Sequence, residues 1–116
     1  MRARLEQVVV DCHDPKTLVR FWSGLLGGTP VDRARDWSHV EPPGFPRLAF
    51  QPVPESKAVK NRLHLDIAVD DLETAATEAV RLGATLSGAA VTDDQGAFQA
   101  MCDPEGNEFC FVTSQD

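Results

Sequence analysis

The chain contains the same order of strand and helix signals twice, and this internal repeat constrains its fold more than any other feature. A strand-like, aliphatic segment precedes each helix signal. Gln7 stands seven positions before the helix signal at Asp14, and His64 stands seven positions before the one at Asp71. Both helical segments then lead to a glycine that is followed two positions later by a threonine. A repeat of this kind predicts two copies of one supersecondary unit.

Each predicted helix begins at an aspartate and carries one apolar stripe. Aspartate accepts hydrogen bonds from the free amide groups at a helix start, and Pro15 suits the first helical position. In both segments apolar residues recur at i, i+3, i+4, i+7 and i+8, which is the period of a helix with one buried face. Gly27 and Gly83 end the two helices. The stripes are Leu18, Phe21, Trp22, Leu25 and Leu26 in the first helix, and Leu72, Ala75, Ala76, Ala79 and Val80 in the second.

Strand-like segments precede and follow each helix. Alternation of apolar and polar residues marks residues 5–11 and 63–69, and the turn at 103–107 closes a hairpin. The stretches after the helices are 30–40 and 47–53 in the first half, and 85–86, 97–102 and 108–113 in the second. Each half is therefore predicted to be a β-α-β-β-β unit.

The repeat predicts an α+β fold in which two tandem modules form curved mixed sheets around a cleft. The modules span about residues 4–53 and 62–113, and the proline-containing, polar stretch 52–61 links them. A helix on only one face of each sheet leaves the other face to be covered by the twin module or by a second chain. At 116 residues the chain suits one domain.

Composition excludes several classes of partner. The formal net charge is -7, and an acidic surface repels the phosphates of nucleic acids. No apolar run is long enough to cross a membrane, and the N-terminal residues do not have the pattern of a signal peptide. The three cysteines, Cys12, Cys102 and Cys110, suggest no disulfide framework. We therefore expect a cytoplasmic protein with neither nucleic acid nor membrane as its partner.

Three segments, in order and at suitable separations, resemble the vicinal oxygen chelate superfamily, which contains glyoxalases, bleomycin-resistance proteins and dioxygenases. They are Val8–Pro15 with Phe21–Gly27, then Asn61–Asp66 with Asp70–Leu72, and finally Asp103–Cys110. The likeness covers nearly the whole chain and looks closest to the glyoxalase-like subgroup. It implies a small oxygenated substrate, a homodimer, and lyase, isomerase or dioxygenase chemistry.

The resemblance also implies a site for one divalent metal ion. Metal-dependent relatives take ligands from the first and last strands of each module, and the matching first-strand residues are Gln7 and His64. Cys110 stands where such relatives have glutamate, and Gln51 is the candidate on the last strand of the first module. Cysteine favours softer metals than Mg²⁺, so this set departs from the usual pattern and resembles part of a zinc site.

His64 is the first candidate for a catalytic residue, as a metal ligand or as an acid and base. Alternation places Asp66 on the same face, where it would orient His64 or bind substrate; the alternative is a plain structural pair with His64, Arg62 or Lys60. Cys110 is a candidate for substrate binding, or else a small buried hydrophobic residue between two phenylalanines.

Further candidates lie on the remaining strands and in the linker. Trp37 could line a pocket for a planar ligand, with Gln7 and Gln51 as further substrate-binding residues. His39 faces either solvent or the cleft, because the alternation of this segment does not fix the direction of its side chain. The basic stretch 57–62 is either a solvated linker or a surface that recognises an anionic group.

Two functions follow from these residues. The first is a glyoxalase-like enzyme that uses a metal ion as a Lewis acid on a small oxygenated molecule, with His64 as ligand or as acid and base. The second is a metal-free module that binds a small molecule or sequesters a drug. The incomplete ligand set and the aromatic residues near the strands support this alternative, and we prefer the first function because His64 and Gln7 match the family's ligand positions.

Overall fold

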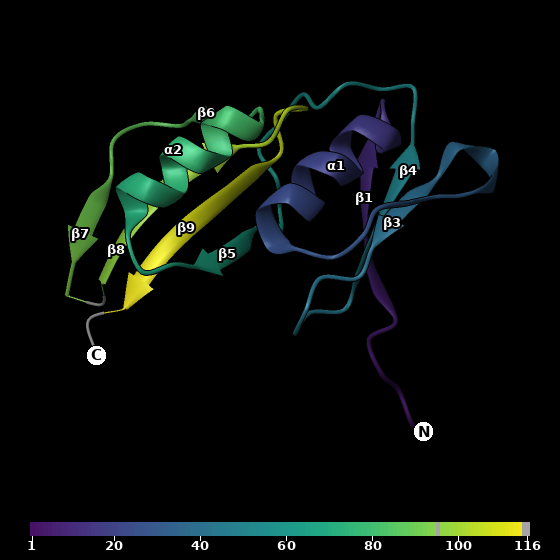
Figure 1. Ribbon diagram of the computed structural model, residues 1–116, viewed down its shortest axis with the longest axis horizontal. Helices are drawn as coiled ribbons and strands as arrows, with labels where there is room; N and C mark the ends of the chain where they lie inside the picture. The colour runs from purple at the N-terminus through teal and green to yellow at the C-terminus, as the bar shows by residue number, and fades with distance from the viewer. Residues whose placement is uncertain (95, 115–116) are drawn as a thin grey trace. The chain divides into compact units, whose positions relative to one another are not determined.

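The chain folds into two compact units, Met1–Ser56 and Lys57–Asp116. The computed structural model describes residues 1–94 and 96–114, and each unit is an α+β arrangement of one helix and one mixed sheet (Figure 1). This confirms the predicted α+β fold built from two tandem modules. Neither of the two described helices is long and apolar enough to cross a bilayer. That both modules together form one domain stays a prediction.

The first unit contains one four-stranded sheet with the strand order β1-β4-β3-β2. β1 and β4 run parallel, and the other neighbours are antiparallel. A 3-10 turn at Ala34–Asp36 interrupts the stretch that we predicted as strand-like between residues 30 and 40. The other elements are β1 (Gln7–Cys12), α1 (Pro15–Leu26), β2 (Val31–Asp32), β3 (Ser38–Val40) and β4 (Arg47–Pro52).

The second unit repeats this topology, with β5 parallel to β9 and β9 antiparallel to β8. β6 and β7 pair with successive parts of β8, so they occupy the place of one interrupted strand. The sequence pattern did not indicate β7. The elements are β5 (Leu65–Ala68), α2 (Leu72–Leu82), β6 (Thr85–Leu86), β7 (Val91–Asp93), β8 (Gly96–Cys102) and β9 (Glu108–Ser114).

Both helices start at the predicted aspartates. Asp14 accepts hydrogen bonds from the backbone amide of Thr17 at 3.3 Å and from its hydroxyl at 2.6 Å. Asp71 accepts the equivalent pair from Thr74, at 2.8 and 2.6 Å. Each side chain thus satisfies an amide group that the helix leaves free, which explains why the two helices begin at matching positions of the repeat.

The two helices pack to different depths. In α1, Leu18 and Val19 are fully buried, and Phe21 and Trp22 are nearly so. In α2 only Ala79 is buried, whereas Val80, which we expected in the apolar stripe, is 47% exposed. The stripe of α2 consists mainly of small side chains, which leave space between the helix and its sheet.

Candidate functional site

The face of the second sheet that points away from α2 carries three of the residues that sequence analysis singled out. Phe109 and Phe111 of β9 are buried on the helix side, and Cys110 between them points to the opposite face, where it is partly buried. The register pairs Asp66 of β5 with Cys110. Side chains of directly paired residues lie on the same face of a sheet, so Asp66 and Cys110 are neighbours.

His64 lies one residue before β5 and joins this pair. Its Nε2 atom is 3.2 Å from Oδ1 of Asp66, and the two side chains are 51% and 56% exposed. One ligand atom each from His64, Asp66 and Cys110 lie within 4.8 Å of one another. The structure therefore brings together three candidates from the sequence, although His64 and Cys110 are 46 positions apart along the chain.

The thiol groups of this face are held in their neutral form. Burial raises the pKa of Cys110, and the negative charge of Asp66 raises it further, while Lys60 opposes the effect. Burial and the carboxylates of Glu108 and Asp103 also raise the pKa of Cys102. A thiol with a raised pKa is a weak nucleophile at neutral pH. Cys110 is therefore a poor nucleophile on its own, and a metal ion that binds it has to displace its proton.

Part of the basic linker has a structural role. The ammonium group of Lys57 pairs with Glu108 at 3.1 Å, and Glu108 also accepts a hydrogen bond from the backbone amide of Asn61 at 3.0 Å. Burial opposes ionisation of Glu108, but the hydrogen bonds from Asn61 and Lys57 outweigh it and lower its pKa. These contacts attach the segment before His64 to the first residue of β9, and so they help to position His64.

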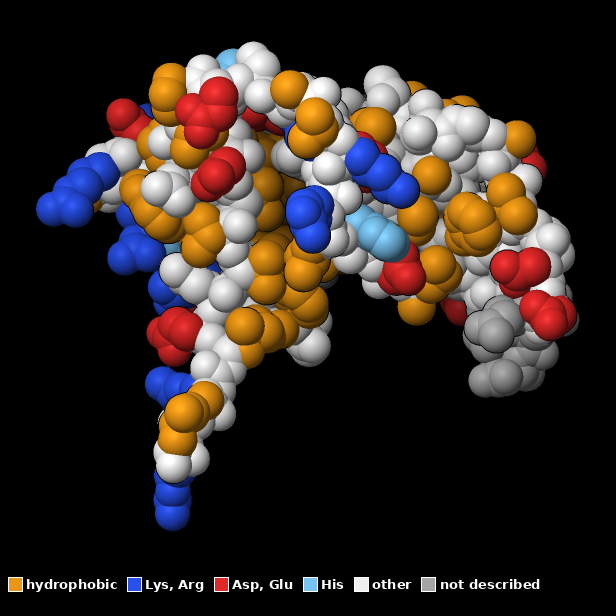
Figure 2. Space-filling view, turned by 180° about the vertical axis from the view of Figure 1, so that it is seen from behind, with side chains coloured by type: hydrophobic (Ala, Val, Ile, Leu, Met, Phe, Trp, Pro, Cys, Tyr) orange, Lys and Arg blue, Asp and Glu red, His pale blue; other side chains and the backbone are white. Residues whose placement is uncertain are grey.

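In the first unit, Gln7 and Trp37 line one hollow, with a volume of about 460 Å³. Arg33, which caps the start of the 3-10 turn, and Ala34 and Arg35 within the turn complete its lining. The residues that the structure describes provide no acidic partner for Arg33 or Arg35. Arginine and lysine side chains gather along this unit at the left edge of Figure 2. A planar ring beside unpaired guanidinium groups suits a planar anion.

His39, whose orientation the sequence left open, lies beside this basic surface. Its register partner Ala49 pairs in turn with Val9, so His39 points to the face of the sheet opposite α1. Burial lowers the pKa of His39, and the positive charges of Arg47 and Arg33 lower it further. Its Nδ1 atom is buried and has no hydrogen-bond partner among the described residues. His39 is therefore a neutral imidazole at neutral pH.

Gln51 lies away from Gln7, although both belong to the same face of the first sheet. The register pairs Gln7 with Arg47 and Asp11 with Gln51. Four residues along a strand separate the two glutamines by roughly 13 Å. Gln51 thus does not share the hollow that Gln7 and Trp37 line, and its role as a ligand residue stays a prediction.

Sequence analysis overlooked Arg33 and Arg35. Their signal was present, because the motif Arg33-Ala34-Arg35-Asp36 is unusually basic for a chain with a net charge of -7. The turn itself could not be foreseen, since Arg35 and Asp36 adopt positive φ angles of 62° and 65°, which is uncommon outside glycine. That conformation brings both arginines to the hollow.

Comparison with known proteins identifies relatives of the whole chain. The family described as the glyoxalase-like domain matches residues 7–112. A glyoxalase/bleomycin resistance protein/dioxygenase family enzyme from Burkholderia phytofirmans is 19% identical, with a TM-score of 0.81 over 97% of this chain and 99% of that one. A glyoxalase-related enzyme from Fulvimarina pelagi is 18% identical, with a TM-score of 0.74 over 96% and 88%. No curated protein matches the sequence.

Proposed function

Because the chain belongs to the glyoxalase-like domain family, we propose that it binds a small oxygenated organic molecule with the help of one divalent metal ion. His64, Asp66 and Cys110 hold the ion, and Zn²⁺ suits them best. The observation that carries this proposal is the convergence of their ligand atoms within 4.8 Å. The role of Gln7 as an additional ligand, implied by the family resemblance, stays a prediction.

The chemistry of these donors fits zinc. Zinc accepts imidazole nitrogen, thiolate sulfur and carboxylate oxygen, and its catalytic sites use three protein ligands with one position left open. Donor atoms around a tetrahedral zinc ion lie about 3.5 Å apart. The side chains of His64 and Asp66 are about half exposed, so they are free to close the remaining distance by rotation.

The ion would supply a Lewis acid that polarises an oxygen atom of the bound molecule, as lyase or isomerase chemistry requires. The protein's own residues perform the other tasks. Before the ion binds, the contact at 3.2 Å between His64 and Asp66 keeps these two ligand residues together. Lys60 lies close enough to affect the ionisation of Cys110, and it adds positive charge where an oxygen atom would become negative.

The direct test is calorimetric titration of tag-free, metal-free protein with Zn²⁺. We expect one ion per chain, and at least about tenfold weaker binding in His64→Ala. His13→Ala is the matched control, because His13 lies outside the cluster and contacts the carbonyl of Pro54 at 3.1 Å. Equal affinity in wild type and His64→Ala, or no zinc binding by wild type, would overturn the proposal.

The ligand half of the proposal needs a second titration. Acetohydroxamate offers two adjacent oxygen atoms, and we expect it to bind the zinc-loaded protein but not the metal-free protein. The same affinity in both forms would show that the metal takes no part in recognition. Binding to zinc-loaded wild type that is lost in Asp66→Ala would place the probe at the cluster.

The hollow beside Trp37 favours a second candidate function, metal-free binding of a planar anion. The guanidinium groups of Arg33 and Arg35, which have no acidic partner in the part of the chain that the structure describes, would bind the negative charge of the anion. The ring of Trp37 would pack against its flat surface. Trp22 is the other tryptophan, so Trp22→Phe leaves the fluorescence of Trp37 as the reporter. We expect 2-naphthoate to quench this fluorescence without metal, and the neutral 2-naphthol to quench it much less. Equal quenching by both probes would exclude recognition of the anion.

A further inference from the structure

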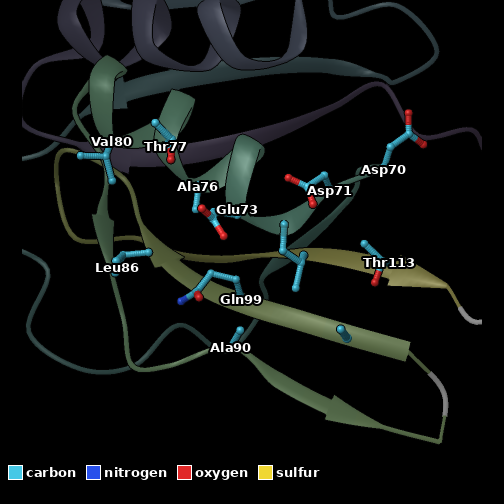
Figure 3. Close-up of a pocket in the computed structure, with 12 residues that line it drawn as sticks. Asp70, Asp71, Glu73, Ala76, Thr77, Val80, Leu86, Ala90, Gln99 and Thr113 are labelled. Carbon is cyan, nitrogen blue, oxygen red and sulfur yellow. The ribbon is translucent and has the colours of Figure 1, made fainter.

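A hollow with a volume of about 880 Å³ lies between α2 and the sheet of the second unit (Figure 3). This volume is in the range of small-molecule sites. Ala97 and Gln99 of β8 reach the hollow, and they alternate with Ala100, which pairs with Cys110. The hollow therefore lies on the opposite face of the sheet from the cluster at His64, and the proposed metal site does not account for it.

Part of its wall is apolar and only partly covered. Ala76 and Val80 contribute from α2, Leu86 from β6 and Ala97 from β8. Val80 and Leu86 remain 47% and 57% exposed. Exposure of these apolar side chains to water is unfavourable. An apolar group bound in the hollow would cover both residues and so stabilise the complex.

Gln99 supplies a polar group at the floor. It is only 7% exposed, and its Nε2 atom donates to the carbonyls of Gly88 and Ala100, each at 2.9 Å. Because both partners are acceptors, they fix which end of the amide is the nitrogen. The Oε1 atom has no protein partner among the described residues. This oxygen is not among the buried polar atoms that lack a partner, so it reaches the solvent in the hollow, and a ligand that donates a hydrogen bond to it would take the place of water.

The charged groups around the hollow are all acidic. Glu73 extends from α2 toward the strand that carries Gln99 in Figure 3, and the described residues offer it no ion pair. Asp70 lies at the same end of α2, whereas Asp71 is engaged with Thr74 as the helix cap. No lysine, arginine or histidine is among the described lining residues.

We propose that this hollow binds a small organic cation in which an ammonium group is attached to an apolar body. The ammonium group donates to the carboxylate of Glu73 and to Oε1 of Gln99, and the apolar body lies against Ala76, Val80 and Leu86. A neutral molecule of the same shape lacks the positive charge that the carboxylate of Glu73 attracts, and an anionic one is repelled by that carboxylate. The second unit has eleven acidic and four basic residues, so its overall field also attracts cations.

The test uses the full chain and a pair of probes that differ only in charge, 2-phenylethylammonium and 2-phenylethanol. Titrations followed by two-dimensional amide NMR report affinity and location together. We expect the ammonium probe to bind more tightly and to shift the amide signals of Ala76, Leu86 and Gln99. Equal affinity for both probes, or shifts that occur elsewhere, would overturn the proposal.

Three variants make the test specific. Glu73→Gln removes the charge and should weaken binding of the ammonium probe about fivefold to tenfold, while binding of the alcohol is unchanged. Glu78→Gln is the matched control on the same helix, because Glu78 pairs with Arg81 and does not line the hollow. Ala76→Leu fills the hollow with a good helix former and should abolish binding of both probes.

Other outcomes contradict the proposal. If Glu73→Gln and Glu78→Gln weaken binding equally, the probe responds to the general charge of the protein and has no specific site. If sedimentation shows a dimer that Leu86→Lys converts to monomer, a second copy of the chain covers the hollow. If neither probe binds wild type, the hollow holds only water.

Discussion

At the scale of single residues, the helix cap Asp14 shows how an ionised side chain can stabilise the fold, and this contribution can be tested. The hydrogen bonds from the side chain and backbone of Thr17 lower the pKa of Asp14 below 3.8. Because the pKa of Asp14 is lower in the folded state than in the unfolded state, ionisation of Asp14 stabilises the fold. This stabilisation is complete above the pKa that Asp14 has in the unfolded chain, and it is lost as the pH falls through the pKa that Asp14 has in the folded protein. Asp14→Ala should cost about 1 kcal/mol in the free energy of unfolding at pH 7.

Urea denaturation between pH 2 and pH 7 checks this prediction. The difference between wild type and Asp14→Ala should shrink as the solution becomes more acidic. Asp14→Asn is the control, since asparagine is also a good cap but does not titrate. A cost of Asp14→Ala that is the same at all pH values would show that the ionised carboxylate contributes nothing.

Gly28 is a second residue whose structural role is testable. Its φ angle is +91°, and a Cβ atom there would lie 2.8 Å from Cγ2 of Val40 and 2.9 Å from the carbonyl oxygen of Glu41. Gly44 also has a positive φ, of +75°, but nothing lies within 4 Å of its added Cβ. Gly44→Ala should therefore cost only the backbone strain, about 1 kcal/mol.

Gly28→Ala should cost more than about 2 kcal/mol, because the close contacts add to the strain. Thermal unfolding of both variants measures the difference. Equal costs would mean that the chain around Val40 moves aside easily.

Residue identity predicted some parts of the candidate site and not others. Strand alternation placed Asp66 on the face of His64, and the structure shows the two side chains in contact at 3.2 Å. Alternation within one strand says nothing about register between strands. Cys110 lies near Asp66 because β9 pairs with β5 in this register. Gln51 lies away from Gln7 because of the register in which β1 pairs with β4.

At the scale of elements, the hairpin between β8 and β9 determines where Cys110 lies. Asp103 at its start is 3% exposed, and its carboxylate accepts from the amides of Glu105 at 2.9 Å and Asn107 at 3.0 Å, and from the Asn107 side chain at 3.0 Å. Asp103→Ala leaves these donors without a partner and should cost about 2–4 kcal/mol.

Denaturant midpoints measure this cost. Asp103→Asn keeps one oxygen acceptor and should lose less than Asp103→Ala. If the two variants are equally stable, or if Asp103→Ala matches wild type, the turn does not depend on this carboxylate.

Helices were easier to predict than short strands, for a physical reason. Each helix is specified locally by a cap such as Asp71, an apolar stripe and a terminal glycine, so ten or so residues carry the signal. The three residues of β7 are all exposed, so no apolar pattern marks them as a strand. β7 forms by pairing its backbone with that of β8. How deeply α2 is buried depends likewise on the sheet against which it packs. The periodicity of the helix sequence carries no information about that sheet.

At the scale of the whole molecule, charge is divided unequally along the chain. The first unit has seven basic and seven acidic residues, so the net charge of -7 belongs to the second unit. The proposed metal cluster and the acidic hollow both lie in that second unit. Arg33 and Arg35, which have no acidic partner among the described residues, lie in the first. This division predicts that cations and anions bind to different units, which NMR titrations resolve residue by residue.

The oligomeric state is a prediction at the same scale. The family resemblance implies a homodimer, and the repeat alternatively allows one chain to complete its own fold. We expect sedimentation equilibrium to give twice the mass of the 12.7 kDa chain. A monomer at all concentrations would contradict this expectation without affecting the metal site, whose three ligands come from one unit.

The most direct test of the central claim is the absorption spectrum of the protein titrated with Co²⁺ in place of zinc. Ligation by Cys110 predicts a near-ultraviolet charge-transfer band from thiolate to cobalt, together with visible bands typical of four-coordinate cobalt. Both should saturate at one ion per chain, and Cys110→Ser should lose the charge-transfer band, whereas Cys102→Ser should keep it. A charge-transfer band that persists in Cys110→Ser, or no spectral change in wild type, would contradict the claim that His64, Asp66 and Cys110 form a metal site.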